Sequence, residues 1–138
     1  MSETQPKSDT WMPKSPLAVL DLLPNPIMIA DNGMVIRYVN DAATQMFQLI
    51  EADIRKDLPN FRADDVVGKS IDVFHKDPAH QRRIMDGVRK WHDGGFMIGG
   101  KSLAFRATLQ TDENSKTTAI VVEWQDRTAV QAQADQLA

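Results

Sequence analysis

Two strictly alternating stretches near the C-terminus carry the clearest structural signal in the chain. Residues 101–110 and 116–125 alternate apolar with polar side chains. Successive side chains of a strand point to opposite faces, so each stretch predicts a strand with one buried face. The residues expected to line the core are Leu103, Phe105, Ala107 and Leu109 from the first strand, and Thr118, Ile120, Val122 and Trp124 from the second. A polar turn at 112–115 separates them, and Gly99-Gly100 separates the first from a short strand predicted over 96–98.

The N-terminal part of the chain predicts a short helix followed by a hairpin. Ser15 is expected to cap a helix that has proline at its first position and ends at Pro24. Two β-prone runs at 26–30 and 34–39 are joined by Asp-Asn-Gly at 31–33, residue types that tolerate the positive φ of a tight turn.

Helical and irregular segments fill the middle of the sequence. Asn40 or Asp41 is expected to cap a helix, and a second helical stretch is predicted over 51–58, where Pro59 stops it. No single period persists over 60–76, which predicts short helical turns and loop.

Two further amphipathic helices are predicted. One begins at Pro78, has a stripe of Ile84, Val88 and Trp91, and ends at Gly94-Gly95, so Trp91 is expected to pack and not to touch a cofactor. The other begins at Asp126, and its stripe is Val130, Ala134 and Leu137. That stripe is too narrow to be buried without a partner, and with the apolar N-terminal helix it predicts a homodimer.

The order of these elements predicts an α+β fold. Helix, two strands, short helices, a longer helix, three strands and an exit helix favour a five-stranded antiparallel sheet with helices on one face. Residues 1–14 are polar and are expected to be a flexible leader. We expect one domain over 15–125, including the N-terminal cap helix, and an exit helix over 126–138.

Charge and composition exclude several classes of function. The net charge is −3, from 16 Lys and Arg against 19 Asp and Glu, which gives no broad basic surface for nucleic acid. No apolar run approaches the roughly 20 residues of a membrane span, and the first residues do not resemble a signal peptide, so we expect a cytoplasmic protein. The absence of cysteine excludes disulfides, thiolate metal sites, cysteine nucleophiles and thioether-linked haem. No hydrolase, phosphate-loop or zinc-protease motif is present, so no enzymatic activity is expected.

Four segments carry a resemblance to a known family. VIRYVNDAATQMF at 35–47 and EWQDRT at 123–128 resemble PAS domains, the second at the junction with the signalling helix, and the similarity covers about 16–138. IRKDLPNF at 54–61 and SIDVFHKDPAHQRR at 70–83 resemble the PAS domains of bacterial chemoreceptors, including aerotaxis-type receptors that bind haem b. This resemblance implies a PAS fold and a sensory function.

The resemblance also implies roles for individual residues. His75 matches the iron ligand of the haem-binding group, and Trp124 matches the tryptophan that donates a hydrogen bond to bound oxygen. Neutral imidazole is a good iron ligand, and without cysteine the site would hold noncovalent haem b. An indole N–H donates but cannot accept, which suits dioxygen. Leu103 and Phe105 on the neighbouring strand would supply an apolar wall that excludes water.

Other interpretations of these residues stay open. A single histidine such as His75 is often a surface residue, and Trp124 can simply be part of the core. His80 is a competing ligand or a helix-cap residue, and His92 is expected to be exposed near the Gly-Gly pair. One basic residue could meet a haem propionate, from the set Lys76, Arg82, Arg83, Arg89 and Lys90.

Two functions of different classes remain. The first is a haem-based gas sensor. In it, ligand binding reorients Trp124, which changes how residues 126–128 orient the exit helix. The second is a cofactor-free adaptor that docks on a sensor kinase, a chemoreceptor or another copy of itself. A noncovalent flavin is also compatible, whereas photosensors that bond their chromophore through cysteine are excluded.

Overall fold

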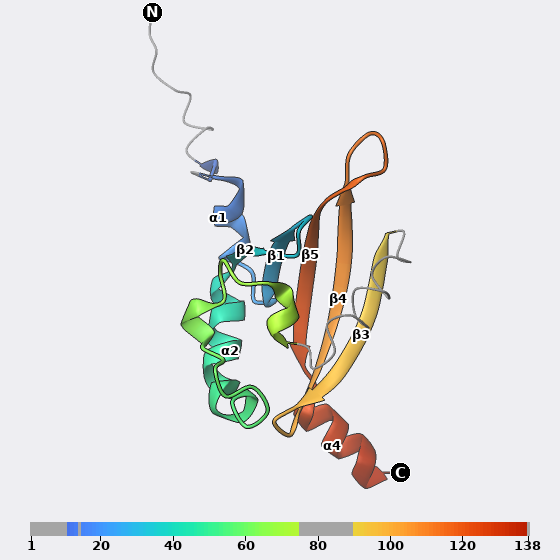
Figure 1. The fold of residues 1–138 in the computed structure, drawn as a ribbon. Helices are drawn as coiled ribbons and strands as arrows, with labels where there is room; N and C mark the ends of the chain where they lie inside the picture. The colour runs from blue at the N-terminus through green and yellow to red at the C-terminus, as the bar shows by residue number, and fades with distance from the viewer. Residues whose placement is uncertain (1–10, 14, 75–89, 138) are drawn as a thin grey trace, which may run out of the picture.

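One antiparallel sheet of five strands organises the chain (Figure 1). The structure is a computed structural model and describes residues 11–13, 15–74 and 90–137. The strands are β1 (Ile27–Asp31), β2 (Ile36–Val39), β3 (Trp91–Ile98), β4 (Lys101–Thr111) and β5 (Thr117–Asp126). Their order in the sheet is β2-β1-β5-β4-β3, so the last strand pairs with the first. The predicted five-stranded antiparallel sheet is confirmed.

The third strand begins five residues earlier than the sequence predicts. Trp91 pairs with Thr108 of β4, and the Gly94-Gly95 pair lies within β3, so the prediction that Trp91 completes a helix stripe ended by glycines is wrong. The physical reason is that β4 is eleven residues long and offers backbone partners along all of β3. Trp91 is 49% exposed and is not part of the core. Most of the helix predicted from Pro78 lies outside the described residues.

Helix α2 (Asp41–Ile54) covers one face of the sheet (Figure 1). Asn40, and not Asp41, caps it, because the Asn40 side chain accepts a hydrogen bond from the backbone N–H of Ala43 at 3.0 Å. The two helices predicted here are one, since the apolar stripe continues without interruption; its buried residues are Ala43, Phe47, Ile50 and Ile54. The 3₁₀ turns η2 (Ala63–Asp65) and η3 (Ile71–Phe74) confirm the expectation of short helical turns after residue 60.

Helices α1 (Pro16–Leu20) and α4 (Thr128–Leu137) lie at opposite ends of the molecule (Figure 1). Ser15 caps α1 as predicted, although the helix ends four residues before Pro24. No residue of α4 is buried, and its predicted stripe stays exposed: Val130 is 47% and Leu137 88% exposed. No helix in the described part of the chain is long and apolar enough to cross a membrane.

The core lies between α2 and the inner face of the sheet. The two alternating strands bury the face that the sequence predicts, with Leu103 and Ala107 from β4 and Ile120 and Val122 from β5. Thr118 is the exception, because it is exposed at the far end of β5 and shares a hydrogen bond with the Gln110 side chain at 3.0 Å.

Candidate cofactor-binding site

Six aromatic side chains meet on the inner face of the sheet, and we call them the aromatic cluster. They are Phe47 from α2, Phe61, Phe74 from η3, Phe96 from β3, Phe105 from β4 and Trp124 from β5. Trp124 contacts four of the other five rings, and its ring centroid lies 5.2 Å from that of Phe74, 5.6 Å from Phe47, 5.7 Å from Phe105 and 6.0 Å from Phe96. Ring pairs at these separations are in direct contact. The cluster therefore connects α2, η3 and the strands β3 and β4 to β5.

Trp124 is the one member of the aromatic cluster with a polar side-chain atom. Its indole Nε1 is buried and has no hydrogen-bond partner among them. Buried N–H groups are nearly always paired, and an unpaired one costs about 1–3 kcal/mol. Because an indole N–H can only donate, it is suited to a ligand that presents an acceptor atom to the inner face of the sheet.

Three of the four predicted site residues come together. Phe105 and Trp124 are direct cross-strand partners, and Leu103 lies on the same face of β4, fully buried. Phe105 is partly buried and packs against the core. The fourth residue, His75, lies outside the described residues; in sequence it directly follows Phe74, which contacts Trp124. His80, the competing ligand, also lies outside them.

His92 differs from its prediction. It pairs with Ala107 on β3 and is half-buried, not exposed. Its ring centroid lies 5.9 Å from that of Phe105 on the inner face. The reason is the same as for Trp91: residues 91–95, predicted as the end of a helix, belong to strand β3.

Sequence analysis missed three of the residues that contact Trp124. Phe47 could have been found, because it shares a helix face with Ala43 and Ile50. Phe74 lies in a segment without periodicity, and Phe96 lies in a strand whose start was predicted wrongly. The local sequence therefore did not indicate that either residue faces the core.

The residues present fit noncovalent haem in two respects. The wall is apolar and aromatic, as the surroundings of a macrocycle must be to limit water access, and Trp124 offers an unpaired donor. Among the described residues no three His, Asp or Glu side chains gather to hold a bare metal ion. Haem iron needs only one ligand from the protein, the role that the resemblance to haem-binding PAS domains implies for His75.

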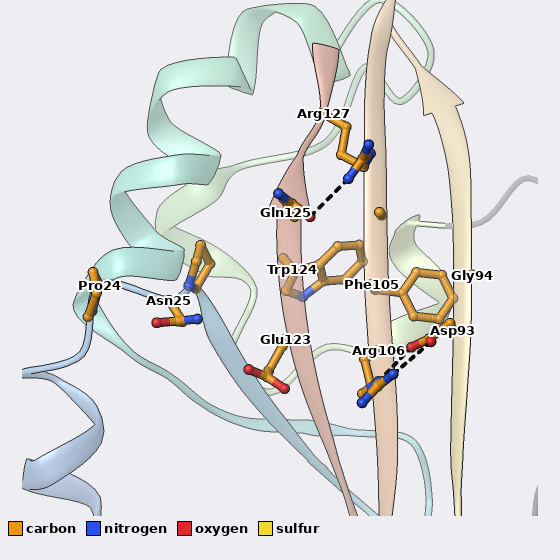
Figure 2. Close-up of a pocket in the computed structure, with 12 residues that line it drawn as sticks. Pro24, Asn25, Asp93, Gly94, Phe105, Arg106, Glu123, Trp124, Gln125 and Arg127 are labelled. Atoms are coloured by element: carbon orange, nitrogen blue, oxygen red, sulfur yellow. Dashed lines mark hydrogen bonds and ion pairs between the residues drawn. The ribbon is translucent and has the colours of Figure 1, made fainter. Parts of the chain in front are cut away.

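The opposite face of the sheet carries a groove of different chemistry (Figure 2). It encloses about 680 Å³ between residues 24–26 and the strands β3, β4 and β5. Arg106 donates two hydrogen bonds to Asp93, at 2.7 and 2.9 Å, and its guanidinium lies 4.2 Å from the centre of the Trp91 ring. The hydrogen bond from Arg106 lowers the pKa of Asp93, and the same bond raises the pKa of Arg106. These exposed charges make the outer groove a poor site for an apolar cofactor.

The exit of β5 is tied to the start of β4. Asp126 accepts hydrogen bonds from the backbone N–H of Thr128 at 2.9 Å and from its hydroxyl at 2.5 Å. The Thr128 hydroxyl oxygen in turn accepts from the backbone N–H of Ser102 at 3.0 Å, and the N–H of Arg127 donates to the Ser102 carbonyl at 2.7 Å. The first turn of α4 is thus anchored to both strands that form the Trp124–Phe105 pair.

Comparisons with known proteins agree with this geometry. Residues 17–78 match the family model described as PAS domain. The methyl-accepting chemotaxis protein McpB of Pseudomonas aeruginosa is 38% identical over 111 residues, which make up 80% of this chain and 16% of McpB. The chain therefore spans about a sixth of that relative.

Two solved structures extend the comparison. A structure of the Aer2 receptor of Vibrio cholerae, described as a dual PAS-haem oxygen sensor, is 28% identical with a TM-score of 0.64, over 74% of this chain and 93% of that one. The PAS domain of a Colwellia psychrerythraea protein has a TM-score of 0.56 at 12% identity, over 81% of this chain and 93% of that one, and shows the fold alone.

Proposed function

The chain belongs to the PAS domain family, and we propose that it is a non-enzymatic sensory module that binds haem b and responds to oxygen as part of chemotaxis signalling. The observation that carries this proposal is the buried indole N–H of Trp124, which has no partner among the described residues. The similarity to a receptor described as a PAS-haem oxygen sensor supports the choice of ligand.

Each site residue has a defined task in this proposal. His75, the residue after Phe74 of the aromatic cluster in the sequence, would supply the imidazole that holds the haem iron. Haem, when bound, would supply the iron centre for a diatomic gas. Trp124 would donate its Nε1–H to an acceptor atom of the ligand, and Leu103 and Phe105 would keep water away from that atom.

The signal leaves the domain through β5. Trp124 stands two residues before Asp126, whose carboxylate organises the first turn of α4. A change in the side chain of Trp124 that shifts β5 against β4 alters the three-residue junction and so the direction of α4. Any such coupling requires that the two arrangements differ in ligand affinity.

An absorption experiment tests the proposal. Protein produced with haem supply, then reduced and exposed to oxygen and carbon monoxide, is expected to show a Soret band that shifts with each gas. His75→Ala is expected to lose the band, whereas His80→Ala and His92→Ala serve as matched controls that keep it. A wild-type protein that stays colourless at full haem supply refutes haem binding; loss of the band in His80→Ala alone refutes the assignment of His75.

Trp124→Leu tests the donor role. Loss of a hydrogen bond worth about 0.5–1.5 kcal/mol is expected to speed oxygen dissociation up to roughly tenfold, with faster oxidation of the haem. Trp91→Leu, on the outer face, is the matched control. Equal oxygen dissociation rates in wild type and Trp124→Leu contradict the role of Trp124.

A cofactor-free adaptor is the second candidate, and a specific observation favours it. The rings of the aromatic cluster touch one another, so a planar cofactor can enter only if Phe47 and Phe74 separate from the sheet. In this alternative the exposed stripes of α1 and α4 dock on a sensor kinase, a chemoreceptor or a second copy of the chain. A colourless protein that binds such a partner would support it.

The assembly and location follow as further proposals. We assign 15–125 to the sensory domain and 126–138 to the exit helix with its junction, although the helix itself begins at Thr128 and not at Asp126 as predicted, in a cytoplasmic homodimer. Most of the leader predicted over 1–14 lies outside the described residues. The apolar side chains exposed on both terminal helices support dimerisation; examples are Leu17 and Val19 of α1 and Val130 and Leu137 of α4. A monomeric mass by light scattering at high protein concentration contradicts the dimer.

A further inference from the structure

The inner face of β3 has a gap in its row of side chains. His92, Gly94 and Phe96 are alternate residues on this face, and Gly94 pairs directly with Phe105 of β4. The Phe105 ring lies over the glycine, with centroid distances of 5.9 Å to His92 and 6.3 Å to Phe96. Figure 2 shows the Phe105 ring beside Gly94, with Trp124 on the adjoining strand.

No side chain of any size fits at position 94 while Phe105 keeps this place. An added Cβ would lie 2.6 Å from Cζ and 3.0 Å from Cε1 of Phe105, and 3.2 Å from Nε2 of His92. Real Cβ atoms essentially never approach carbon that closely, so the ring would have to move. The backbone gives no other reason for a glycine, because Gly94 is not among the glycines with positive φ.

The direction in which the ring moves is fixed by its neighbours. His92 and Phe96 stand on either side of it along β3, and the sheet backbone lies beneath it. Phe105 lies on β4, between Gly94 of β3 and Trp124 of β5, and its ring contacts the indole at a centroid distance of 5.7 Å. A methyl group at position 94 therefore pushes Phe105 toward the indole that carries the unpaired N–H.

We propose that Gly94 is a specificity-determining position of the gas site, because its missing side chain lets the Phe105 ring lie over β3 and keeps that ring from pressing on the Trp124 indole, the proposed donor to the ligand. The inference rests on the proposed oxygen-sensing function for its consequence, but the steric relation between positions 94 and 105 is independent of haem. Gly94 acts through Phe105 and is a positioning residue. A larger side chain at 94 lowers the affinity for oxygen by crowding its donor.

A double-mutant cycle tests this relation: Gly94→Ala, Phe105→Leu and the combination of both. The first readout, made on protein without haem, is the indole N–H cross-peak of Trp124 in a proton–nitrogen NMR spectrum. Gly94→Ala is expected to shift this peak and leave that of Trp91, on the outer face, in place. In the Phe105→Leu background the same glycine substitution is expected to shift it far less, because no ring is left to displace.

The second readout is the oxygen dissociation rate of the haem-loaded protein. Gly94→Ala is expected to raise it roughly two- to tenfold, the range that corresponds to an aromatic side chain forced off its rotamer. The Soret band should persist, since the substitution leaves the proposed iron ligand, His75, in the chain. Gly33→Ala, whose Cβ meets only the Asp31 side chain at 3.4 Å, is the control for the glycine-to-alanine change itself.

Three outcomes would overturn the inference. They are an unshifted Trp124 peak in Gly94→Ala, a shift of the same size with and without the Phe105 ring, and an unchanged oxygen dissociation rate in a haem-loaded Gly94→Ala. Should Gly94→Ala not fold, the double variant is expected to fold, and failure of both contradicts the steric relation. A wild type that never binds haem refutes the proposed function, while the NMR cycle still decides the steric relation.

Discussion

Replacing Asn40 by alanine is expected to lower the stability of the domain more than any other single change at a polar residue in the described chain. Asn40 is fully buried, and its side chain makes four hydrogen bonds to backbone groups. Oδ1 accepts from the N–H groups of Ile27 at 2.8 Å and Ala43 at 3.0 Å, and Nδ2 donates to the carbonyls of Leu20 at 2.8 Å and Asn25 at 2.9 Å. One amide therefore joins α1, β1 and the start of α2.

The magnitude follows from these four bonds. A hydrogen bond contributes about 1 kcal/mol net, and a helix cap alone about 1 kcal/mol, so Asn40→Ala is expected to lower the free energy of unfolding by about 3–4 kcal/mol. Asn40→Asp keeps the two accepted bonds but places a carboxylate against the carbonyls of Leu20 and Asn25, so it is expected to be destabilising as well. Asp41→Ala, at the neighbouring exposed position, is the control.

Urea denaturation followed by circular dichroism measures the effect. With a slope of about 2 kcal/mol per molar urea, the midpoint of Asn40→Ala is expected about 1.5–2 M below that of the wild type, and that of Asp41→Ala within about 0.3 M of it. A loss under about 1 kcal/mol for Asn40→Ala would show that water replaces the amide at no cost and would refute the claim that this residue ties the three elements together.

Two further predictions concern other joints of the fold. Tyr38, the only tyrosine, has its pKa raised above the ordinary value of 10.0 by burial and by its hydrogen bond to Asp21 at 2.6 Å. Since the folded protein favours the neutral phenol, the contribution of Tyr38 to stability is complete below pH 10 and is lost as the pH rises further. Ultraviolet titration should show the phenolate forming at higher pH in the folded protein than in the unfolded chain. In Asp21→Asn the phenolate is expected to form at lower pH than in the wild type. Identical titration of wild type and Asp21→Asn contradicts this. Gly99→Ala is expected to lower the free energy of unfolding, measured by urea denaturation, by at least about 3 kcal/mol, because its Cβ would lie 1.7 Å from the carbonyl oxygen of Asp53. Gly100 also has a positive φ, but a Cβ there would meet no atom within 4 Å, so Gly100→Ala is expected to lower it by only about 1 kcal/mol. Equal losses for the two glycines would show that the close approach to α2 is unimportant.

The sequence predicts the fold well wherever one period persists. β4 and β5 alternate over ten residues or more, and their buried faces match the prediction up to Thr118 at the exposed end. The start of β3 was predicted wrongly because Trp91 also fits a helical stripe with Ile84 and Val88, and a short apolar pattern does not decide between helix and strand. The backbone partners that β4 offers decided it, and they are not a property of the local sequence.

The candidate site was predictable only in part for a related reason. Leu103, Phe105 and Trp124 lie on two paired strands whose alternation puts them on one face. The remaining aromatic rings come from segments far apart in the chain, so only the tertiary structure brings them to Trp124. The gap at Gly94 is invisible in the sequence, where the Gly-Gly pair indicates a turn.

The exit helix depends on the strand pair that carries the site. α4 buries none of its side chains, so among the described residues its direction is set by its first turn and not by packing along its length. That turn is held by Asp126 at the end of β5 and by Ser102 at the start of β4. Trp124 lies two residues from the first of these, a distance of about 7 Å along a strand, with no loop between them. A shift of β5 relative to β4 therefore reaches the hydroxyl of Thr128 without being absorbed by a flexible segment. A helix fixed at one end and free along its stripe converts such a small shift into a larger displacement of its far end, which is what an output element of a sensor requires.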